Sequence, residues 1–207
     1  MDHVFYSWAA QAELDPITVD RASGSWFWDE GGKKYLDFSS QLVNANLGHQ
    51  HPDLVAAIIA QAQVLTTISP MIANAKRSVI ASLVAQRAPG DLMSVFFTTG
   101  GAEAIEHAVR LARQHTGRTK MLAAYRSYHG GTGVAIGLTG EPRRWGTEPT
   151  NVDVVRFFGP YPYRSPWSTN SPEEETTAAL SHLQQVIELE GAQNIAGLIL
   201  ESVVGPN

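Results

Sequence analysis

The sequence contains no cysteine and no excess of basic residues, and each absence excludes a class of function. Without cysteine the chain has no disulfide framework, no thiolate metal site and no thiol nucleophile, which is compatible with a reducing cytosol. Lys and Arg number 15 and Asp and Glu number 20, giving a net charge of −5. We therefore expect no nucleic-acid partner and no anionic membrane partner, because both need a basic surface.

Long apolar runs are also absent. The longest, residues 54–60, is far shorter than the roughly 18 residues that cross a bilayer, so we expect no membrane segment. The N-terminus carries Asp2 where a secretory signal has a basic residue, which favours a cytoplasmic protein. His49 and His51 have no clear third ligand nearby, so we expect no metal site. The composition, 43% hydrophobic and 17% charged, is that of a folded globular chain.

The pattern of apolar residues changes along the chain. Residues 26–38 alternate around a Gly pair and predict a β-hairpin, whereas helical spacing predicts helices that begin at Pro52 and after the N-cap Asn74. Strands and helices then alternate. We expect strands over 95–98, 121–125, 152–157 and 195–200, and helices over 103–116, 132–138 and 172–191. This order predicts an α/β fold with a mostly parallel sheet, helices on both of its faces and a β-rich N-terminal segment.

A Gly pair follows the first of these strands. Gly100 and Gly101 lead directly into a helix, whose backbone N–H groups and dipole would hold a phosphate well. The pair is neither a dinucleotide fingerprint nor a Walker loop, because the two glycines are adjacent and no lysine follows. Taken alone, a Gly pair is more often a tight turn without a ligand.

Two further strands end in residues that could carry chemistry. Tyr128 could stack on a flat heterocycle at the same sheet edge, although packing is the commoner role of a lone tyrosine. Glu201 ends a buried strand, where a carboxylate is uncommon unless it is paired, which favours a functional role. Arg143 and Arg144 could meet an anionic substrate group, but a solvated loop is the commoner reading of such a pair.

Several motifs in this order resemble the class III aminotransferases, pyridoxal-phosphate (PLP) enzymes of fold type I that act largely on ω-amino acids and amines. The matching positions are residues 24–26, 29, 32–33, 35–38, 46–49, 51–52, 96–104, 128–130 and 201. They extend over nearly the whole chain, and their combination is far more specific than any one motif. The resemblance therefore favours a ligand at the Gly pair over an empty turn.

The resemblance implies six residues of a PLP site: Gly100, Gly101, Ala102, Tyr128, His129 and Glu201. The first three would supply amides for the phosphate, and Tyr128 would stack on the pyridine ring with His129 beside it. Glu201 would pair with a substrate-side arginine or lie near the ring. Leu42 and Val43 match positions that line the substrate pocket.

The implied reaction moves an amino group from an ω-amino acid or amine, resembling taurine, β-alanine or 4-aminobutyrate, to a 2-oxo acid such as pyruvate. It is a ping-pong exchange with Schiff-base chemistry on PLP. The family's Schiff-base lysine and ring-nitrogen aspartate lie downstream of the strand that ends at Glu201. None of the four lysines of this sequence, Lys33, Lys34, Lys76 and Lys120, ends a strand that faces the expected pocket.

We therefore expect residues 1–50 to be the N-terminal segment of the small domain and residues 51–207 to be the first part of the large PLP-binding domain. By resemblance the whole enzyme is a homodimer, and this chain alone is expected to be inactive. Two alternatives stay open: a non-catalytic domain that binds PLP or another phosphorylated ligand, and a truncated remnant without an independent role.

Overall fold

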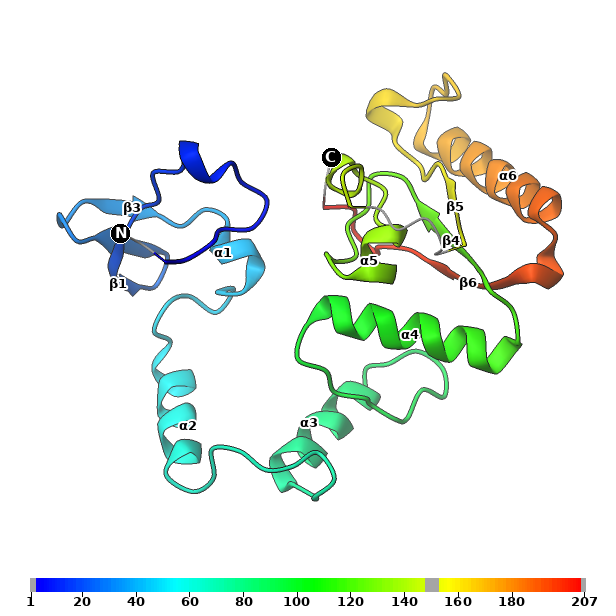
Figure 1. The fold of residues 1–207 in the computed structure, drawn as a ribbon. Coiled ribbons are helices and arrows are strands. Elements are labelled where there is room, and N and C mark those ends of the chain that lie inside the picture. The colour runs from blue at the N-terminus through cyan, green and yellow to red at the C-terminus, as the bar shows by residue number, and fades with distance from the viewer. Residues whose placement is uncertain (1–2, 148–152, 206–207) are drawn as a thin grey trace. The chain divides into compact units, whose positions relative to one another are not determined.

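The computed structural model describes residues 3–147 and 153–205, which belong to two compact units, residues 1–95 and 96–207 (Figure 1). The first unit contains β1 (Val19–Ser23), β2 (Trp26–Asp29), β3 (Lys34–Leu36), α1 (Ser40–Val43), α2 (Pro52–Ala62) and α3 (Ala75–Ala85). The second contains α4 (Gly101–Thr116), β4 (Lys120–Ala124), α5 (Gly133–Leu138), β5 (Val154–Phe157), α6 (Pro172–Glu190) and β6 (Ile195–Ile199). Within these described residues no helix is both long and apolar enough to cross a membrane.

The sheet of the first unit is antiparallel, in the order β1-β2-β3. The predicted hairpin is confirmed as β2 and β3, and the paired residues Phe27 and Tyr35 stack with their ring centres 5.0 Å apart. The strand β1 was not foreseen. Gly24 exchanges two backbone hydrogen bonds with His49, which joins the hairpin to the chain ahead of α2.

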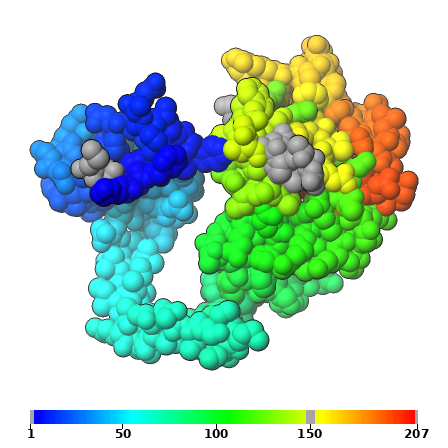
Figure 2. All heavy atoms as spheres, in the orientation of Figure 1, coloured from blue at the N-terminus to red at the C-terminus, as the bar shows by residue number. Residues whose placement is uncertain are grey.

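The helices α2 and α3 begin where the sequence predicts them. Pro52 occupies the first turn of α2, and the Asn74 side chain accepts hydrogen bonds from the N–H groups of Lys76 and Arg77 at 2.9 and 3.2 Å. Every residue of both helices is at least partly exposed. The space-filling view shows the cyan segment that contains α2 uncovered on its visible face (Figure 2). Both helices therefore present apolar side chains to solvent.

The second unit confirms the predicted α/β fold. Its sheet is parallel, and β4 lies between β5 and β6 (Figure 1). Met121 and Ala123 pack on one face with residues of α4 and α5, whereas Leu122 and Ala124 pack on the other with residues of α6. The alternation of side chains along β4 thus places helices on both faces.

One predicted strand is wrong. Residues 95–98 have no strand structure, and Phe96 in their middle is 68% exposed. A strand needs a neighbour that satisfies its backbone N–H and C=O groups, and none of the described residues pairs with this segment. The domain boundary expected at residue 50 stays a prediction, since the contacts inside the chain divide it at residues 95 and 96.

A carboxylate that the sequence analysis did not single out joins α4 to α5. Glu106 Oε1 accepts hydrogen bonds from the Thr132 hydroxyl at 2.6 Å and from the N–H groups of Val134 and Ala135 at 2.8 and 3.2 Å. It therefore caps the N-terminus of α5 from another helix.

Candidate functional site

Segments far apart in the sequence meet in the second unit, and Gly130 marks one such close approach. A Cβ atom at Gly130 would lie 2.6 Å from the Cβ of Ala102 and 3.0 Å from that of Ala135. The φ angle of Gly130 is +135°, which residues with a side chain rarely adopt. Only glycine fits here, and it brings the loop after β4 against the first turn of α4.

The N-terminus of α4 opens onto free space. A Cβ added at Gly100 or Gly101 would meet no atom within 4 Å, and no side chain caps this end of the helix. The Glu103 carboxylate instead accepts hydrogen bonds from the hydroxyl and the N–H of Thr99, which lower the pKa of Glu103. The first N–H groups of α4 and its dipole therefore face space that a phosphate could occupy.

The loop after β4 is tied to the end of β6. The Tyr128 N–H donates to Glu201 Oε1 at 2.7 Å, across 73 residues of sequence. The carboxylate of Glu201 thus fixes the backbone at Tyr128 rather than pointing into solvent. The Tyr128 ring is half-buried, and the guanidinium of Arg143 lies over it, 4.3 Å from the ring centre.

His129 is buried. Its backbone N–H donates to the Thr139 hydroxyl at 3.1 Å, and burial lowers the pKa of the imidazole, with the Glu201 charge acting in the opposite direction. Among the described residues, no hydrogen-bond partner reaches the buried Nε2 atom. Buried polar atoms are normally satisfied, so this nitrogen is available to a ligand.

The predicted substrate residues lie in the first unit. Leu42 and Val43 are 87% and 70% exposed on α1, whose four residues have φ angles between 49° and 67°. This is a left-handed turn, which the sequence analysis did not foresee. The Asp37 carboxylate accepts the N–H of Gln41 at 3.3 Å and pairs with His49 Nε2 at 2.7 Å. His49 is thus the partner of a buried aspartate, and Asp37 anchors the turn.

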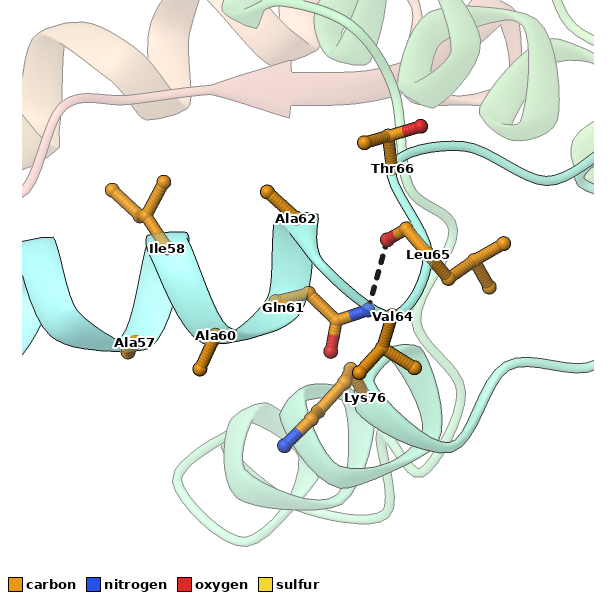
Figure 3. Close-up of a pocket in the computed structure, with 9 residues that line it drawn as sticks. All are labelled: Ala57, Ile58, Ala60, Gln61, Ala62, Val64, Leu65, Thr66 and Lys76. Atoms are coloured by element: carbon orange, nitrogen blue, oxygen red, sulfur yellow. Dashed lines mark hydrogen bonds between the residues drawn. The ribbon is translucent and has the colours of Figure 1, made fainter.

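A hollow of the first unit contains none of the predicted site residues. It measures about 820 Å³ and is lined mainly by small and apolar side chains of α2, including Ile58, with Leu65 beyond it (Figure 3). Of the described residues that line it, Lys76 of α3 alone is charged. The Gln61 side-chain amide donates to the Leu65 carbonyl at 2.9 Å. A smaller hollow of about 440 Å³ lies at the carboxyl edge of the parallel sheet and includes Glu201.

Comparison with known proteins identifies the family of the chain. The family described as Aminotransferase class-III matches residues 8–207. The chain belongs to the class-III aminotransferases. It is 37% identical to the 5-aminovalerate aminotransferase DavT of Pseudomonas aeruginosa over 93% of this chain and 45% of that protein. It is 31% identical to the 4-aminobutyrate aminotransferase GabT of Escherichia coli, over 93% of this chain and 45% of that protein.

Solved aminotransferases share the fold. The taurine:2-oxoglutarate aminotransferase of Bifidobacterium kashiwanohense, in complex with PLP and glutamate, aligns with a TM-score of 0.91 at 37% identity, over 98% of this chain and 46% of that one. An (S)-enantioselective ω-transaminase of Thermomicrobium roseum aligns with a TM-score of 0.92 at 31% identity, over 99% of this chain and 48% of that one. This class-III aminotransferase chain therefore spans less than half the length of these relatives. The cofactor of the family is PLP.

Two residues that organise the aminotransferase fold had no signal in the sequence beyond their charge. Glu106 was one acid among several on a helix, and Glu175 was the third glutamate in a row at a predicted helix start. Glu175 is fully buried and accepts hydrogen bonds from the Tyr161 N–H at 2.7 Å and the Thr169 hydroxyl at 2.5 Å. Which glutamate of such a run turns inward is decided by the loop that packs on it.

Proposed function

We propose that this chain forms the phosphate-binding and ring-binding part of the PLP site of an aminotransferase. The observation that carries the proposal is the contact of Gly130 with Ala102, because it joins the open N-terminus of α4 to the loop that bears Tyr128 and His129. The space in front of Gly100 and Gly101 suits a phosphate ester, and the unpartnered Nε2 of His129 suits a polar group of the ligand.

Each residue has a separate task in this proposal. The N–H groups of Gly100, Gly101 and Ala102 bind the phosphate, and the Tyr128 ring lies against the pyridine ring. Glu201 positions Tyr128 by accepting its N–H. Bound PLP supplies an electron sink for the bonds of the amino group. The protein's contribution from these residues is to bind and orient the cofactor.

The substrates proposed for the whole protein are an ω-amino acid or amine and a 2-oxo acid. The support is the names of the relatives, which act on 5-aminovalerate, 4-aminobutyrate and taurine. In this proposal Leu42 and Val43 line the substrate pocket. The uncovered apolar sides of α2 and α3 support the proposal of a homodimer, and a cytoplasmic location is proposed with it.

We also propose that residues 1–207 do not catalyse amino-group transfer by themselves. Support comes from the lysines. Lys120 begins β4, at the end of the strand opposite Tyr128, and its ammonium pairs with Glu190 at 2.5 Å. Lys33 and Lys34 lie over aromatic rings of the hairpin in the first unit.

Titration of the purified chain with PLP, followed by absorbance, tests the proposed site. We expect saturable binding that weakens about tenfold or more in Gly101→Asp, because the new carboxylate repels the phosphate. The matched control is Gly146→Asp in an exposed loop, which adds the same charge and has the same open surroundings. Equal affinities of the two variants would overturn the assignment of the phosphate site.

Borohydride treatment of the PLP-loaded chain separates the remaining alternatives. PLP that washes away after reduction supports a binding part without its Schiff-base lysine. A lysine of residues 1–207 that becomes covalently labelled contradicts the proposed inactivity. Activity with taurine, β-alanine and 4-aminobutyrate is then measured on the protein expressed from its complete reading frame, and a protein that binds PLP but aminates no 2-oxo acid would favour a non-catalytic binding domain.

A further inference from the structure

A buried aspartate, Asp37, and its partner His49 adjoin the left-handed turn α1. The Asp37 carboxylate pairs with His49 Nε2 at 2.7 Å and accepts the N–H of Gln41, a residue of the turn, at 3.3 Å. We propose that Asp37 and His49 are positioning residues for the amino donor, because they hold the turn that forms a wall of the substrate pocket. This role rests on the proposed function, in which Leu42 and Val43 line that pocket.

The backbone of α1 is strained. All four of its residues carry a side chain and have φ angles between 49° and 67°. Such angles crowd the Cβ atom against the backbone, so a run of them persists only where the surroundings impose it. Packing does not impose it here, since Gln41, Leu42 and Val43 are all exposed. The conformation of the turn therefore depends on its polar contacts.

Hydrogen bonds shape the turn and connect it to the sheet. Inside the turn, the Val43 N–H donates to the Ser39 carbonyl at 3.1 Å. Asp37 Oδ1 accepts the Gln41 N–H at 3.3 Å and the Ser39 hydroxyl at 3.4 Å. Asp37 directly follows β3, so these two bonds join the turn to the sheet of the first unit. A side chain from outside the turn thus stabilises its left-handed conformation.

The backbones on both sides of the pair are attached to two consecutive residues. The Asp37 N–H donates to the Ser25 carbonyl at 2.9 Å, and His49 exchanges hydrogen bonds of 2.7 and 2.9 Å with Gly24. A Cβ atom at Gly48 would lie 3.4 Å from the backbone of Gly24, so the segment before His49 runs close to the turn between β1 and β2. The pair is therefore a fixed support for α1 and not a mobile surface contact.

The charge of Asp37 strengthens this support. Burial raises the pKa of Asp37, but its hydrogen bonds with His49 and Gln41 and the charge of His49 together hold that pKa below its ordinary value. An ionised carboxylate binds N–H donors about twice as strongly as a neutral acceptor does. Asp37→Asn keeps the size of the side chain and removes the charge, so it weakens the support without leaving a cavity.

The conformation of α1 decides where its apolar side chains point. A change from left-handed to right-handed φ rotates the Cα–Cβ bond relative to the chain, so relaxation of the turn moves the Leu42 side chain. In the proposed pocket, Leu42 and Val43 cover methylene groups of an ω-amino acid. Loss of the support should therefore weaken the use of a long donor, 5-aminovalerate, more than that of a short one, β-alanine.

Hydrogen–deuterium exchange of the 207-residue chain, measured by mass spectrometry on peptides with residues 40–45, tests the support of the turn. Asp37→Asn and His49→Gln should each speed exchange there by about tenfold, the size of a weakened charge-assisted hydrogen bond. The matched control is Asp29→Asn. Asp29 also accepts a backbone N–H and a hydroxyl, from Lys33 and Tyr35 at 2.9 Å each, but in the turn between β2 and β3. It should leave exchange at residues 40–45 unchanged.

A rescue variant tests the contribution of strain. Ser40→Gly removes the Cβ atom from one left-handed position and leaves Leu42 and Val43 in place. Added to Asp37→Asn, it should slow exchange of the turn again by about threefold, because glycine adopts this backbone without the steric penalty. Faster exchange in the double variant than in Asp37→Asn alone would refute the role of strain.

Donor selectivity, measured on the protein expressed from its complete reading frame, tests the link to the substrate. In Asp37→Asn the ratio of kcat/KM for 5-aminovalerate to that for β-alanine should fall by about fourfold, the contribution of one buried methylene group. The loss should appear mainly in KM, because the contact is the same in the ground state and the transition state. Asp29→Asn should leave the ratio unchanged.

Three results would overturn the proposal. They are equal selectivity ratios in Asp37→Asn and Asp29→Asn, equal exchange at residues 40–45 in these two variants, and complete exchange of the turn in the unsubstituted chain at the first time point. Exchange requires neither PLP nor turnover. A protein without aminotransferase activity would therefore refute the proposed function, and with it the substrate role of the pair, whereas the exchange results would still decide whether the pair holds the turn.

Discussion

The left-handed turn α1 leads to a stability prediction of unusual sign. Leu42 has φ and ψ of 56° and 43° and is 87% exposed, so its side chain contributes little packing to offset its backbone strain. Left-handed backbone costs a residue with a Cβ atom about 1–2 kcal/mol, and glycine adopts it without that penalty. Replacing Leu42 by glycine should therefore remove strain from the folded state.

The expected gain follows from two opposing contributions. Leu42→Gly relieves about 1–2 kcal/mol of steric strain, and the greater freedom of glycine in the unfolded chain costs about 0.5–1 kcal/mol. We expect the variant to be more stable by up to about 1.5 kcal/mol. The matched control is Leu83→Gly in the right-handed helix α3, where glycine should cost about 1 kcal/mol or more.

Unfolding in urea, followed by the fluorescence of the tryptophans, measures both variants. Trp8, Trp26 and Trp28 lie in the same unit as the two substituted positions. Trp145 and Trp167 lie in the second unit, so both variants are made in a chain that carries Trp145→Phe and Trp167→Phe, in which the signal reports on the first unit. A higher midpoint for Leu42→Gly and a lower one for Leu83→Gly is the expected result. If both substitutions lower the midpoint by similar amounts, the argument from left-handed strain is refuted.

Three further predictions concern the second unit. Gly130→Ala should lower stability by about 2 kcal/mol or more, because the added methyl has no room and φ is +135°. The control Gly146→Ala lies in open space and should change stability by less than about 0.5 kcal/mol. Thermal melts compare the two variants. Glu106→Ala should lower stability by about 0.5–2 kcal/mol, because α5 loses its cap. The control is Glu188→Ala at an exposed position, and equal melting temperatures of the two variants would contradict the capping role. Glu175→Gln should lower stability and flatten its pH dependence in acid, which urea midpoints between pH 3 and 7 measure. Burial raises the pKa of Glu175, but its hydrogen bonds and the charge of Arg126 together hold that pKa below its ordinary value. The contribution of Glu175 to stability is therefore complete above the unfolded pKa and is lost as the pH falls through the folded pKa. An unchanged acid profile in the variant would contradict this.

Local signals predicted most of the helices and strands because their causes are local. Asn74 caps α3 as predicted. The Ser171 hydroxyl accepts the Glu174 N–H ahead of α6, and the left-handed Gly117 follows α4. Each depends on residues a few positions apart. The segment 95–98 had an equally clear apolar pattern and is not a strand, because pairing depends on a neighbour far away in the sequence.

The candidate site was predictable only in part. Strand polarity indicated that Tyr128 and Glu201 would lie at the same sheet edge, and the hydrogen bond between them agrees with that expectation. The roles of Asp37, Glu106 and Glu175 were not visible. Each acts through a partner that the loops bring to it, and no spacing in the sequence encodes such a contact.

The sequence by itself determined the family, through the resemblance of its motifs to the class-III aminotransferases, and the α/β order of the elements. The order of the elements follows from residue types and short spacings, which act before the chain is folded. Tertiary structure alone decided that Gly130 lies on Ala102 and that Asp37 pairs with His49 and anchors a left-handed turn. The physical reason is that these contacts join segments whose distance is set by packing, and packing is a property of the folded chain as a whole.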